Sequence, residues 1–489
     1  MTNQNTGWNF DNSYAKLQSK LFTFAQPDPV RAPNTLLFNY KLATAIGLKI
    51  DPATEAAIAH ILSGNELLEG SEPLAQAYAG HQFGHFAMLG DGRAILLGEH
   101  ITPDNTRLDI QLKGPGATPY SRRGDGRATL RSMLREYLIS EAMHGLGIPT
   151  SRSLAVVTSG EAVYREEVHE GAILTRIASS HIRVGTFEYI HQFLGKEDLE
   201  TYTQYVIERH YPDLKTSNTP AFDLFKAVMD RQIDLMVHWM RVGFIHGVMN
   251  TDNMSIAGET FDYGPCAFMN AYNPATVFSA IDTNGRYAFG NQPKIAQWNL
   301  ACLASALLPI IHTDHAEAVQ MAQAVLNDFP AIYEQKWGNM MGNKLGFNNA
   351  AGNTDVQELI QELLQWMALN GADYTNTFLG IQSDPQNWEG IYAEEPFLIW
   401  YARLQFLWKE LGVDKDDAMR LMQRNNPAFI PRNHLVEQAL DEVCLSRDFI
   451  LFNQMLEVAG NPYVANTSFS ALQMPPDTGD RLYKTYCGT

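Results

Sequence analysis

The hydrophobic pattern divides the chain into two parts of different texture. From about residue 85 to 177, short apolar runs alternate with glycine-containing turns, which is typical of strands. The predicted strands are 94–97, 108–112, 153–157, 162–164 and 172–177. From about residue 196 onward, apolar residues recur every three or four positions, which predicts helices.

One helix interrupts the predicted strands. Apolar residues recur with the helical period between Leu130 and Ala142, and Gly145, Gly147 and Pro149 then end the helix. The remaining predicted helices all lie in the second part, at 295–308, 316–326, 356–368, 397–411 and 434–445. A further helix is predicted to begin with Thr219 as its N-cap and Pro220 as its first helical residue.

This order of elements predicts an α+β protein. A small sheet-rich lobe with one key helix precedes a large, mainly helical lobe, and a doubly wound sheet is excluded because strands and helices do not alternate throughout. We expect residues 1–185 to form an N-terminal extension and the sheet-rich lobe. Residues 186–489 are expected to form the helical lobe, a C-terminal helical extension and a tail that contains a cysteine.

The composition of the chain argues against two kinds of binding partner, nucleic acids and membranes. The 36 basic and 54 acidic residues give a net charge of −18, which argues against a general nucleic-acid surface. A local basic cluster (Arg122, Arg123, Arg127, Arg131 and Arg135) therefore suits a small anion, or else it is a solvated basic face. The sequence shows no secretory signal, no apolar run long enough to cross a bilayer and no metal-binding or disulfide pattern among its four cysteines, so we expect a cytoplasmic protein without a membrane partner.

The first chemical signal combines a glycine turn, a strand lysine and a helix glutamate. The Gly90-Asp91-Gly92 turn lies between two apolar runs, where its backbone N–H groups can approach a phosphate. Lys113 follows in a strand whose apolar residues alternate, so its side chain projects from the face opposite the core. A lysine at such a position is usually a solvated surface residue, which is the alternative role for Lys113. Glu136 lies in the following helix. In protein kinases such a glutamate pairs with the strand lysine and orients it toward phosphate oxygens.

The second signal is a loop with metal-binding potential. His246 and Asn253 have the spacing of a kinase catalytic loop, and Asp262-Tyr263-Gly264 corresponds to the metal-binding triplet that follows it. Asn253 and Asp262 provide oxygen ligands of the kind that Mg²⁺ prefers. Val248 stands where a kinase has its catalytic aspartate. Asp252 is the nearest carboxylate that can act as a base, although it can also cap the turn or support the metal.

Two further groups belong with these signals. A second glycine-containing turn, with Asp125 and Gly126, leads into the helix that carries Glu136 and can hold an anion. Arg176 and Arg183 lie where the two parts of the chain meet, and arginine suits bidentate contact with phosphate. Structural salt bridges are the alternative role for both arginines.

Several long stretches resemble the selenoprotein O family of pseudokinases. They include GDGRA from Gly90, QLKGPGATPYSRRGDGRATLRSMLREYLISEAMHGLGIPT from Gln111, TRIASSHIRVGTFE from Thr175, GFIHGVMNTDNMSI from Gly243 and DYGPCAFM from Asp262. Similar stretches span about residues 75–310. The resemblance implies a kinase-like two-lobed fold that binds ATP in a flipped orientation. It also implies transfer of AMP to Ser, Thr or Tyr hydroxyl groups of proteins, with release of pyrophosphate and use of Mg²⁺ or Mn²⁺, and some members also transfer UMP.

The resemblance also implies roles for single residues. Lys113 binds phosphate and Glu136 supports it, Asn253 and Asp262 hold the metal ion, and Asp252 accepts the proton. The implied nucleotide contacts are Gly90, Gly92, Arg93, Asp125, Gly126, Arg176, Arg183 and Asp262. Because family members from eukaryotes carry selenocysteine near the C-terminus, a regulatory disulfide between Cys266 and Cys487 is a further hypothesis. A residual γ-phosphate kinase and a non-catalytic nucleotide-binding scaffold remain as alternative functions.

Overall fold

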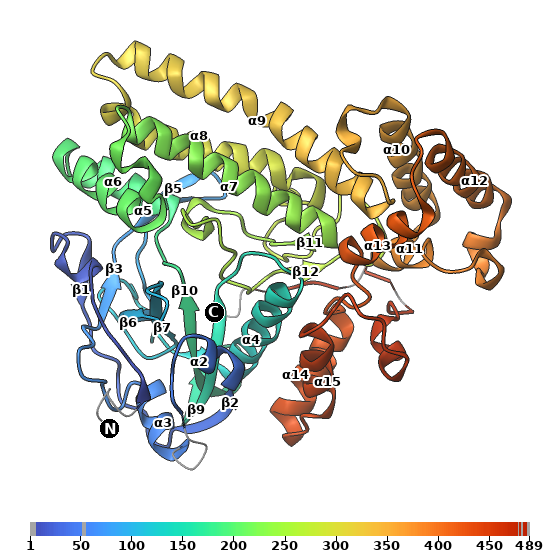
Figure 1. Cartoon of the computed structure of the whole chain (residues 1–489). Coiled ribbons are helices and arrows are strands. Elements are labelled where there is room, and N and C mark those ends of the chain that lie inside the picture. The colour runs from blue at the N-terminus through green and yellow to red at the C-terminus, as the bar shows by residue number, and fades with distance from the viewer. Residues whose placement is uncertain (1–5, 51–54, 478, 481–482, 487–489) are drawn as a thin grey trace.

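An antiparallel sheet forms most of the first part of the chain (Figure 1). In the computed structural model, which describes residues 6–50, 55–477, 479–480 and 483–486, its strands follow the order β1-β3-β6-β7-β10-β9-β2, and β8 pairs with β10. The strands are β1 (Phe22–Phe24), β2 (Asn34–Phe38), β3 (Leu74–Gln76), β6 (Ala94–Ile101), β7 (Arg107–Lys113), β8 (Ala128–Thr129), β9 (Arg152–Tyr164) and β10 (Val168–Ala178). Two small two-stranded sheets pair β4 (Ala79–Gln82) with β5 (His85–Met88) and β11 (Phe244–Ile245) with β12 (Ala267–Phe268).

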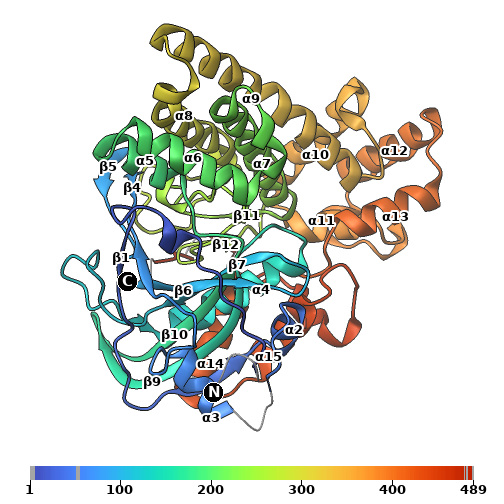
Figure 2. The ribbon, with the colours of Figure 1, turned by 60° about the vertical axis from the view of Figure 1, so that its left-hand side comes forward.

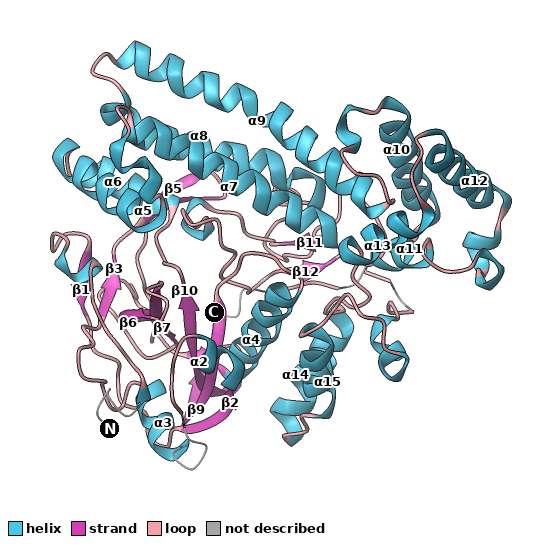
Figure 3. Cartoon of the chain, in the orientation of Figure 1, coloured by secondary structure: helices cyan, strands magenta, loops and turns pink. Residues whose placement is uncertain are grey.

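Helices dominate the chain after the sheet, as Figure 3 shows by colour. Three helices accompany the sheet: α2 (Tyr40–Ala45), α3 (Glu55–Leu62) and α4 (Leu130–Gly145). Those of the second part are α5 (Val184–Phe193), α6 (Lys196–His210), α7 (Pro220–Val242), α8 (Gln292–Ile311), α9 (His315–Lys344), α10 (Thr354–Asn370), α11 (Tyr374–Gly380), α12 (Glu395–Glu410), α13 (Lys415–Asn425), α14 (Asn433–Ser446) and α15 (Ile450–Ala459). The chain thus combines an antiparallel sheet with a mainly helical second part, as predicted.

Both faces of the central strands are covered. Ile110 and Leu112 of β7 pack into an apolar layer with α2 and α3. The other face of β7 carries Asp109, Gln111 and Lys113, which the alternation predicts, but these polar side chains are buried rather than solvated. Helices α4 and α6 cover them, since Lys113 pairs with a residue of α4 and Asp109 with a residue of α6. A buried polar face of this kind must be satisfied by ion pairs and hydrogen bonds.

Helix α4 links the sheet to the C-terminal helices. Thr129 caps its first turn by accepting a hydrogen bond from the N–H of Ser132, and the helix ends at the predicted Gly145. Its apolar side packs on β9 and β10, while α14 and α15 pack against it from elsewhere in the molecule. Figure 2 shows α14 and α15 beside the sheet-rich part. A segment about 300 residues downstream therefore helps to fix the one helix of the predicted sheet region.

A bundle of α5, α7, α8 and α9 forms the centre of the helical part. Together with the preceding turn, α8 forms a 23-residue segment, Phe289–Ile311, whose most apolar 18-residue window has a mean hydropathy of 1.3. By length and composition alone it is long enough to cross a bilayer, so the expectation that no apolar run has this length is wrong. Half of its most apolar window is buried, and it packs against α5, α7 and α9 as a core helix does.

Candidate active site

A cavity of about 880 Å³ is lined by residues from both parts of the chain. This volume falls in the range of pockets that hold small molecules. It is lined by every residue to which the sequence assigns a catalytic, nucleotide-binding, ion-pairing or metal-binding role, namely Gly90, Gly92, Arg93, Lys113, Asp125, Gly126, Glu136, Arg176, Arg183, Asp252, Asn253 and Asp262. Segments as far apart in sequence as Gly90 and Asp262 therefore meet around one cavity.

The strand lysine and the helix glutamate form an ion pair. Lys113 ends β7, and its Nζ donates to Glu136 Oε2 at 2.7 Å and to Asp262 Oδ1 at 2.9 Å. Both Lys113 and Glu136 are buried. Burial and the nearby Arg176 lower the pKa of Lys113. Burial opposes ionisation of Glu136, but the positive charges of Arg176 and Lys113 outweigh it and lower the pKa of this carboxyl group.

Arg176 completes the buried charge cluster. It comes from β10, next to β7 in the sheet, and pairs with Glu136 Oε1 and, at 2.5 Å, with Asp262 Oδ1. Burial opposes the charge of Asp262, yet Arg176 and Lys113 hold the pKa of its carboxyl group well below the usual value. Asp262 has φ +63°, a left-handed conformation that is uncommon outside glycine and is found at functional sites. We name these four residues, Lys113, Glu136, Arg176 and Asp262, the open cluster because they line the cavity.

Arg183 connects the glycine turn to the helical part. It is the N-cap residue of α5, and its guanidinium lies 3.6 Å from Asp91 Oδ1 and 4.1 Å from the centre of the Tyr78 ring. Asp91 and Tyr78 also line the cavity, and sequence reasoning missed both. Asp91 could have been predicted, because it lies between the two glycines of the turn. No sequence motif marks Tyr78.

Packing explains the glycines in the two turns. A Cβ atom on Gly90 would lie 2.4 Å from the Tyr120 ring, and one on Gly92 would lie 2.8 Å from the Tyr120 carbonyl oxygen. Gly126 has φ +65°, and its Cβ would overlap the Gly116 carbonyl oxygen at 1.8 Å. These positions require glycine for close packing of the cavity wall, whether or not their N–H groups also bind phosphate.

The loop between β11 and β12 carries the remaining candidates. Val248 lines the cavity, and its carbonyl oxygen accepts a hydrogen bond from Asn253 Nδ2 at 3.0 Å. Asp252 is only 8% exposed, and its Oδ1 has no hydrogen-bond partner among the described residues. Burial raises the pKa of Asp252 to about 6, although Arg183 acts in the opposite direction. A Cβ atom on Gly80 of β4 would lie 2.9 Å from this oxygen, so β4 packs directly on the Asp252 side chain.

The donor set fits a hard divalent cation. Asn253 and Asp262 both face the cavity and offer amide and carboxylate oxygens. The hydrogen bond from Asn253 Nδ2 to Val248 fixes the amide so that its oxygen stays available as a ligand.

Comparison with known proteins shows which family the chain belongs to. The family described as "Protein adenylyltransferase SelO" matches residues 5–459 of the chain. The chain belongs to the SelO family. It is 51% identical over 489 residues to "Protein nucleotidyltransferase YdiU" of Nitrosococcus oceani, covering 100% of this chain and 99% of that protein. Relatives with the same name from Bacillus cytotoxicus and Anoxybacillus flavithermus are also 51% identical, each over 99% of this chain and 99% and 100% of their own lengths.

The basic cluster of this SelO-family chain divides into two groups. Arg122, Arg123 and Arg127 line the cavity; the first two are exposed and Arg127 is half-buried. Arg131 and Arg135 instead pair with Glu437 of α14, so they join α4 to the C-terminal helices, and the anion site suggested for the whole cluster is wrong for these two residues. The Asp125 carboxylate lines the cavity as well, but it pairs with Arg165 at 2.8 and 3.0 Å.

Of the two cysteines in the disulfide hypothesis, the structure describes only Cys266. Cys266 is buried four residues after Asp262, and burial raises the pKa of its thiol to about 12. Cys487 lies outside the described residues, so the disulfide stays a prediction. The described end of the tail does reach this segment, because Thr485 Oγ1 donates to the Pro265 carbonyl oxygen at 2.7 Å.

Proposed function

We propose that this protein transfers AMP from ATP to Ser, Thr or Tyr hydroxyl groups of other proteins and releases pyrophosphate. Membership of the SelO family identifies the chain as a protein nucleotidyltransferase that uses protein substrates. The observation that carries the finer proposal is the open cluster, in which two buried cations and a low-pKa aspartate face one cavity of nucleotide size. Together with Arg183 and a divalent ion on Asp262, such a site would favour a polyanionic ligand.

The arrangement of the two parts supports a kinase-like fold with two lobes. We place the boundary near residue 185, where β10 has ended and α5 begins. The cavity is lined from the sheet side by Lys113 and Arg176 and from the helical side by Asp252 and Asp262. A nucleotide bound there would contact both lobes.

In the proposed reaction, the substrate oxygen attacks the α-phosphorus of ATP and the bond from this phosphorus to the β-phosphate oxygen breaks. Pyrophosphate leaves, and Asp252 accepts the proton of the attacking hydroxyl group. Asp252 is our choice because Val248 cannot accept a proton, while an oxygen of the Asp252 carboxylate has no other hydrogen bond among the described residues. Lys113, Arg176 and Arg183 neutralise the phosphate charge that develops during transfer.

Asn253 and Asp262 would hold Mg²⁺ or Mn²⁺, which when bound neutralises phosphate charge and orients the leaving group. Before the nucleotide binds, the Asp262 carboxylate is held in place by Lys113 and Arg176. Glu136 in turn keeps both cations in position from behind. The protein therefore prepares the position of its metal-binding carboxylate through ion pairs.

Isotope labelling separates this proposal from its alternatives. The protein is incubated with a model protein substrate and with ATP labelled at the α- or the γ-phosphate. Covalent α-label supports nucleotidyl transfer, γ-label indicates a kinase, and no incorporation of either label indicates a nucleotide-binding scaffold. Repeating the assay with α-labelled UTP and Mn²⁺ tests whether UMP is also transferred.

A further inference from the structure

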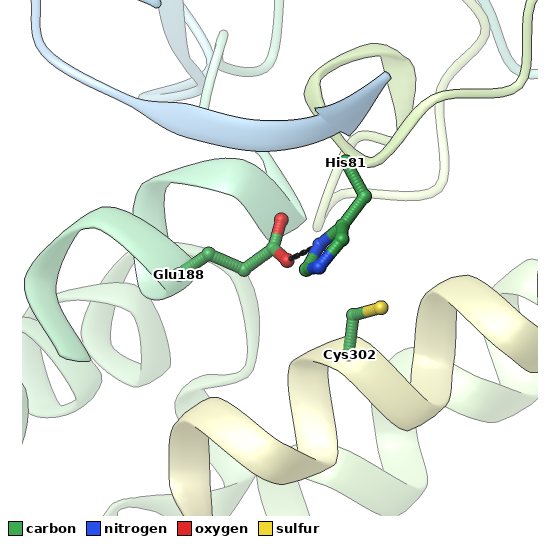
Figure 4. A group of neighbouring side chains, drawn as sticks. All are labelled: His81, Glu188 and Cys302. Atoms are coloured by element: carbon green, nitrogen blue, oxygen red, sulfur yellow. Dashed lines mark hydrogen bonds and ion pairs between the residues drawn. The ribbon is translucent and has the colours of Figure 1, made fainter. Parts of the chain in front are cut away.

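A second group of side chains that could bind a metal ion lies between β4, α5 and α8, outside the cavity lining (Figure 4). His81 comes from β4, Glu188 from α5 and Cys302 from α8, and one donor atom from each lies within 4.8 Å of the others. His81 Nδ1 contacts Glu188 Oε1 directly, and the Cys302 thiol lies below the imidazole ring. Three elements far apart in sequence thus bring a nitrogen, an oxygen and a sulfur donor together.

Glu188 has unused binding capacity in this group. Its side chain is only 5% exposed, and Oε2 has no hydrogen-bond partner among the described residues. A buried carboxylate oxygen without a partner is costly, so such atoms call for a ligand. His81 is 28% exposed and Cys302 is half-buried, which leaves a route for a small ion.

We propose that His81, Glu188 and Cys302 bind one Zn²⁺ ion, with a water molecule as the fourth ligand. Nitrogen, oxygen and thiolate sulfur together suit zinc, whereas Mg²⁺ takes oxygen ligands. The site is therefore different in chemistry from the pair Asn253 and Asp262. With zinc bonds of about 2.0–2.3 Å, donor atoms lie about 3.3–3.8 Å apart, so the widest separation has to close by at most roughly 1.5 Å and the His81–Glu188 contact has to open.

Metal binding changes the protonation of the cysteine. Burial raises the pKa of the Cys302 thiol to about 12 in the metal-free protein, so the thiol is protonated at neutral pH. Zinc coordination displaces this proton to solvent, because the ion binds the thiolate form.

The proposed ion lies next to the loop that carries Asp252. The backbone N–H of His81 donates to Thr251 Oγ1 at 2.7 Å, and the adjacent Gly80 packs on Asp252. On α5, a Cβ atom at Gly185 would lie 2.0 Å from the Ala79 carbonyl oxygen, so this helix also packs tightly on β4. An ion that joins β4, α5 and α8 would hold this packing in place. We assign it a positioning role, because it does not line the cavity.

Cobalt provides a direct test with the full-length protein. The protein is freed of metal with a chelator, kept reduced without nucleotide, and titrated with Co²⁺, which reports thiolate ligation by a charge-transfer band. We expect one equivalent of Co²⁺ to produce this band, Zn²⁺ to remove it, and Zn²⁺ to raise the unfolding temperature. Cys302→Ser should lose the band, while Cys444→Ser, which changes another half-buried thiol, should keep it.

A wild-type protein without the thiolate band, or a band that survives in Cys302→Ser, would overturn the proposal. His81→Gln gives a second test if Cys302→Ser does not fold, because it keeps all four thiols. We expect this variant to bind Co²⁺ at least tenfold more weakly than the wild type. Unchanged affinity in folded His81→Gln would equally reject the site.

Discussion

Two buried ion clusters lie on the same face of the central sheet, and only one of them belongs to the candidate active site. The open cluster surrounds Lys113 at the end of β7. The second, which we name the closed cluster, surrounds Asp109 four residues earlier in the same strand. Asp109 pairs with Arg209 of α6 at 2.5 Å and with His181 at 3.0 Å, and Arg209 also pairs with Glu99 of β6 at 3.2 Å.

The two clusters differ in their access to the cavity. Asp109 and Glu99 are completely buried, and none of the residues of the closed cluster belongs to the cavity lining. In the open cluster, the Asp262 side chain is 26% exposed and faces the cavity. Burial and charge pairing therefore do not identify a site by themselves. A functional assignment needs a charged group that is held in place and can still exchange its partners for a ligand.

The largest effect is expected for Asp252→Asn. If Asp252 accepts the proton, the substitution should lower kcat for transfer by about 10²–10⁴-fold while ATP still binds. Transfer is measured with α-labelled ATP, and binding by calorimetry. Asp234→Asn is the matched control, because it makes the same chemical change in an exposed ion pair with Lys336. Near-normal transfer by Asp252→Asn would leave the base unassigned.

Asp262→Asn tests whether the open cluster exchanges partners with the nucleotide. The substitution removes a carboxylate from Lys113 and Arg176 and from the proposed metal, so we expect transfer to fall by about 10²–10³-fold. Metal-dependent ATP binding should weaken as well, which distinguishes this variant from Asp252→Asn. If both variants retain metal-dependent binding equally, Asp262 is not the ligand.

A substitution in the closed cluster should lower the stability of the protein and leave the rate of transfer nearly unchanged. Asp109→Asn leaves the buried Arg209 without its nearest carboxylate, which typically costs about 3–5 kcal/mol in the free energy of unfolding. Denaturant unfolding measures this loss. At a temperature where the variant is folded, kcat should stay within a few-fold of the wild type. A large loss of kcat without a loss of stability would contradict the division into two clusters.

The sequence predicts the residues of the site better than their packing. Glycine turns, the strand lysine and the loop with Asn253 carry local motifs, so these residues could be identified before the cavity was known. The predicted helices near α7, α8, α9, α10, α12 and α14 are all present, because long amphipathic periods are strong signals. The strand predicted at 162–164 is the end of the long strand β9.

What the sequence could not provide depends on contacts between distant segments. Strands β1 to β5 are three to five residues long and lack a clear alternation, so no pattern predicts them. Arg131 and Arg135 look like an anion site until α14 brings Glu437 beside them. Likewise, His81, Glu188 and Cys302 have no metal-binding spacing in the sequence, since each comes from a separate element.

The smallest expected effect is that of His210, beside the closed cluster, on the stability of the protein at acidic pH. His210 follows Arg209 at the end of α6, is 9% exposed, and has an Nε2 without a hydrogen-bond partner among the described residues. Burial and the charge of Arg209 lower the pKa of His210 to about 3. The unfolded chain therefore binds a proton below about pH 6.5 that the folded protein does not, and stability falls as the pH decreases.

This histidine should contribute a loss of about 1.4 kcal/mol per pH unit below pH 6.5, or roughly 2 kcal/mol at pH 5. Urea unfolding at pH 7 and pH 5 measures the difference. His210→Gln, which stays neutral, should reduce the acid loss by this amount, while His191→Gln on the surface of α5 should not. Equal acid sensitivity of both variants would mean that His210 takes up a proton in the folded protein. The charge of Arg209 would then be screened, and the closed cluster would be more open to solvent than its burial indicates.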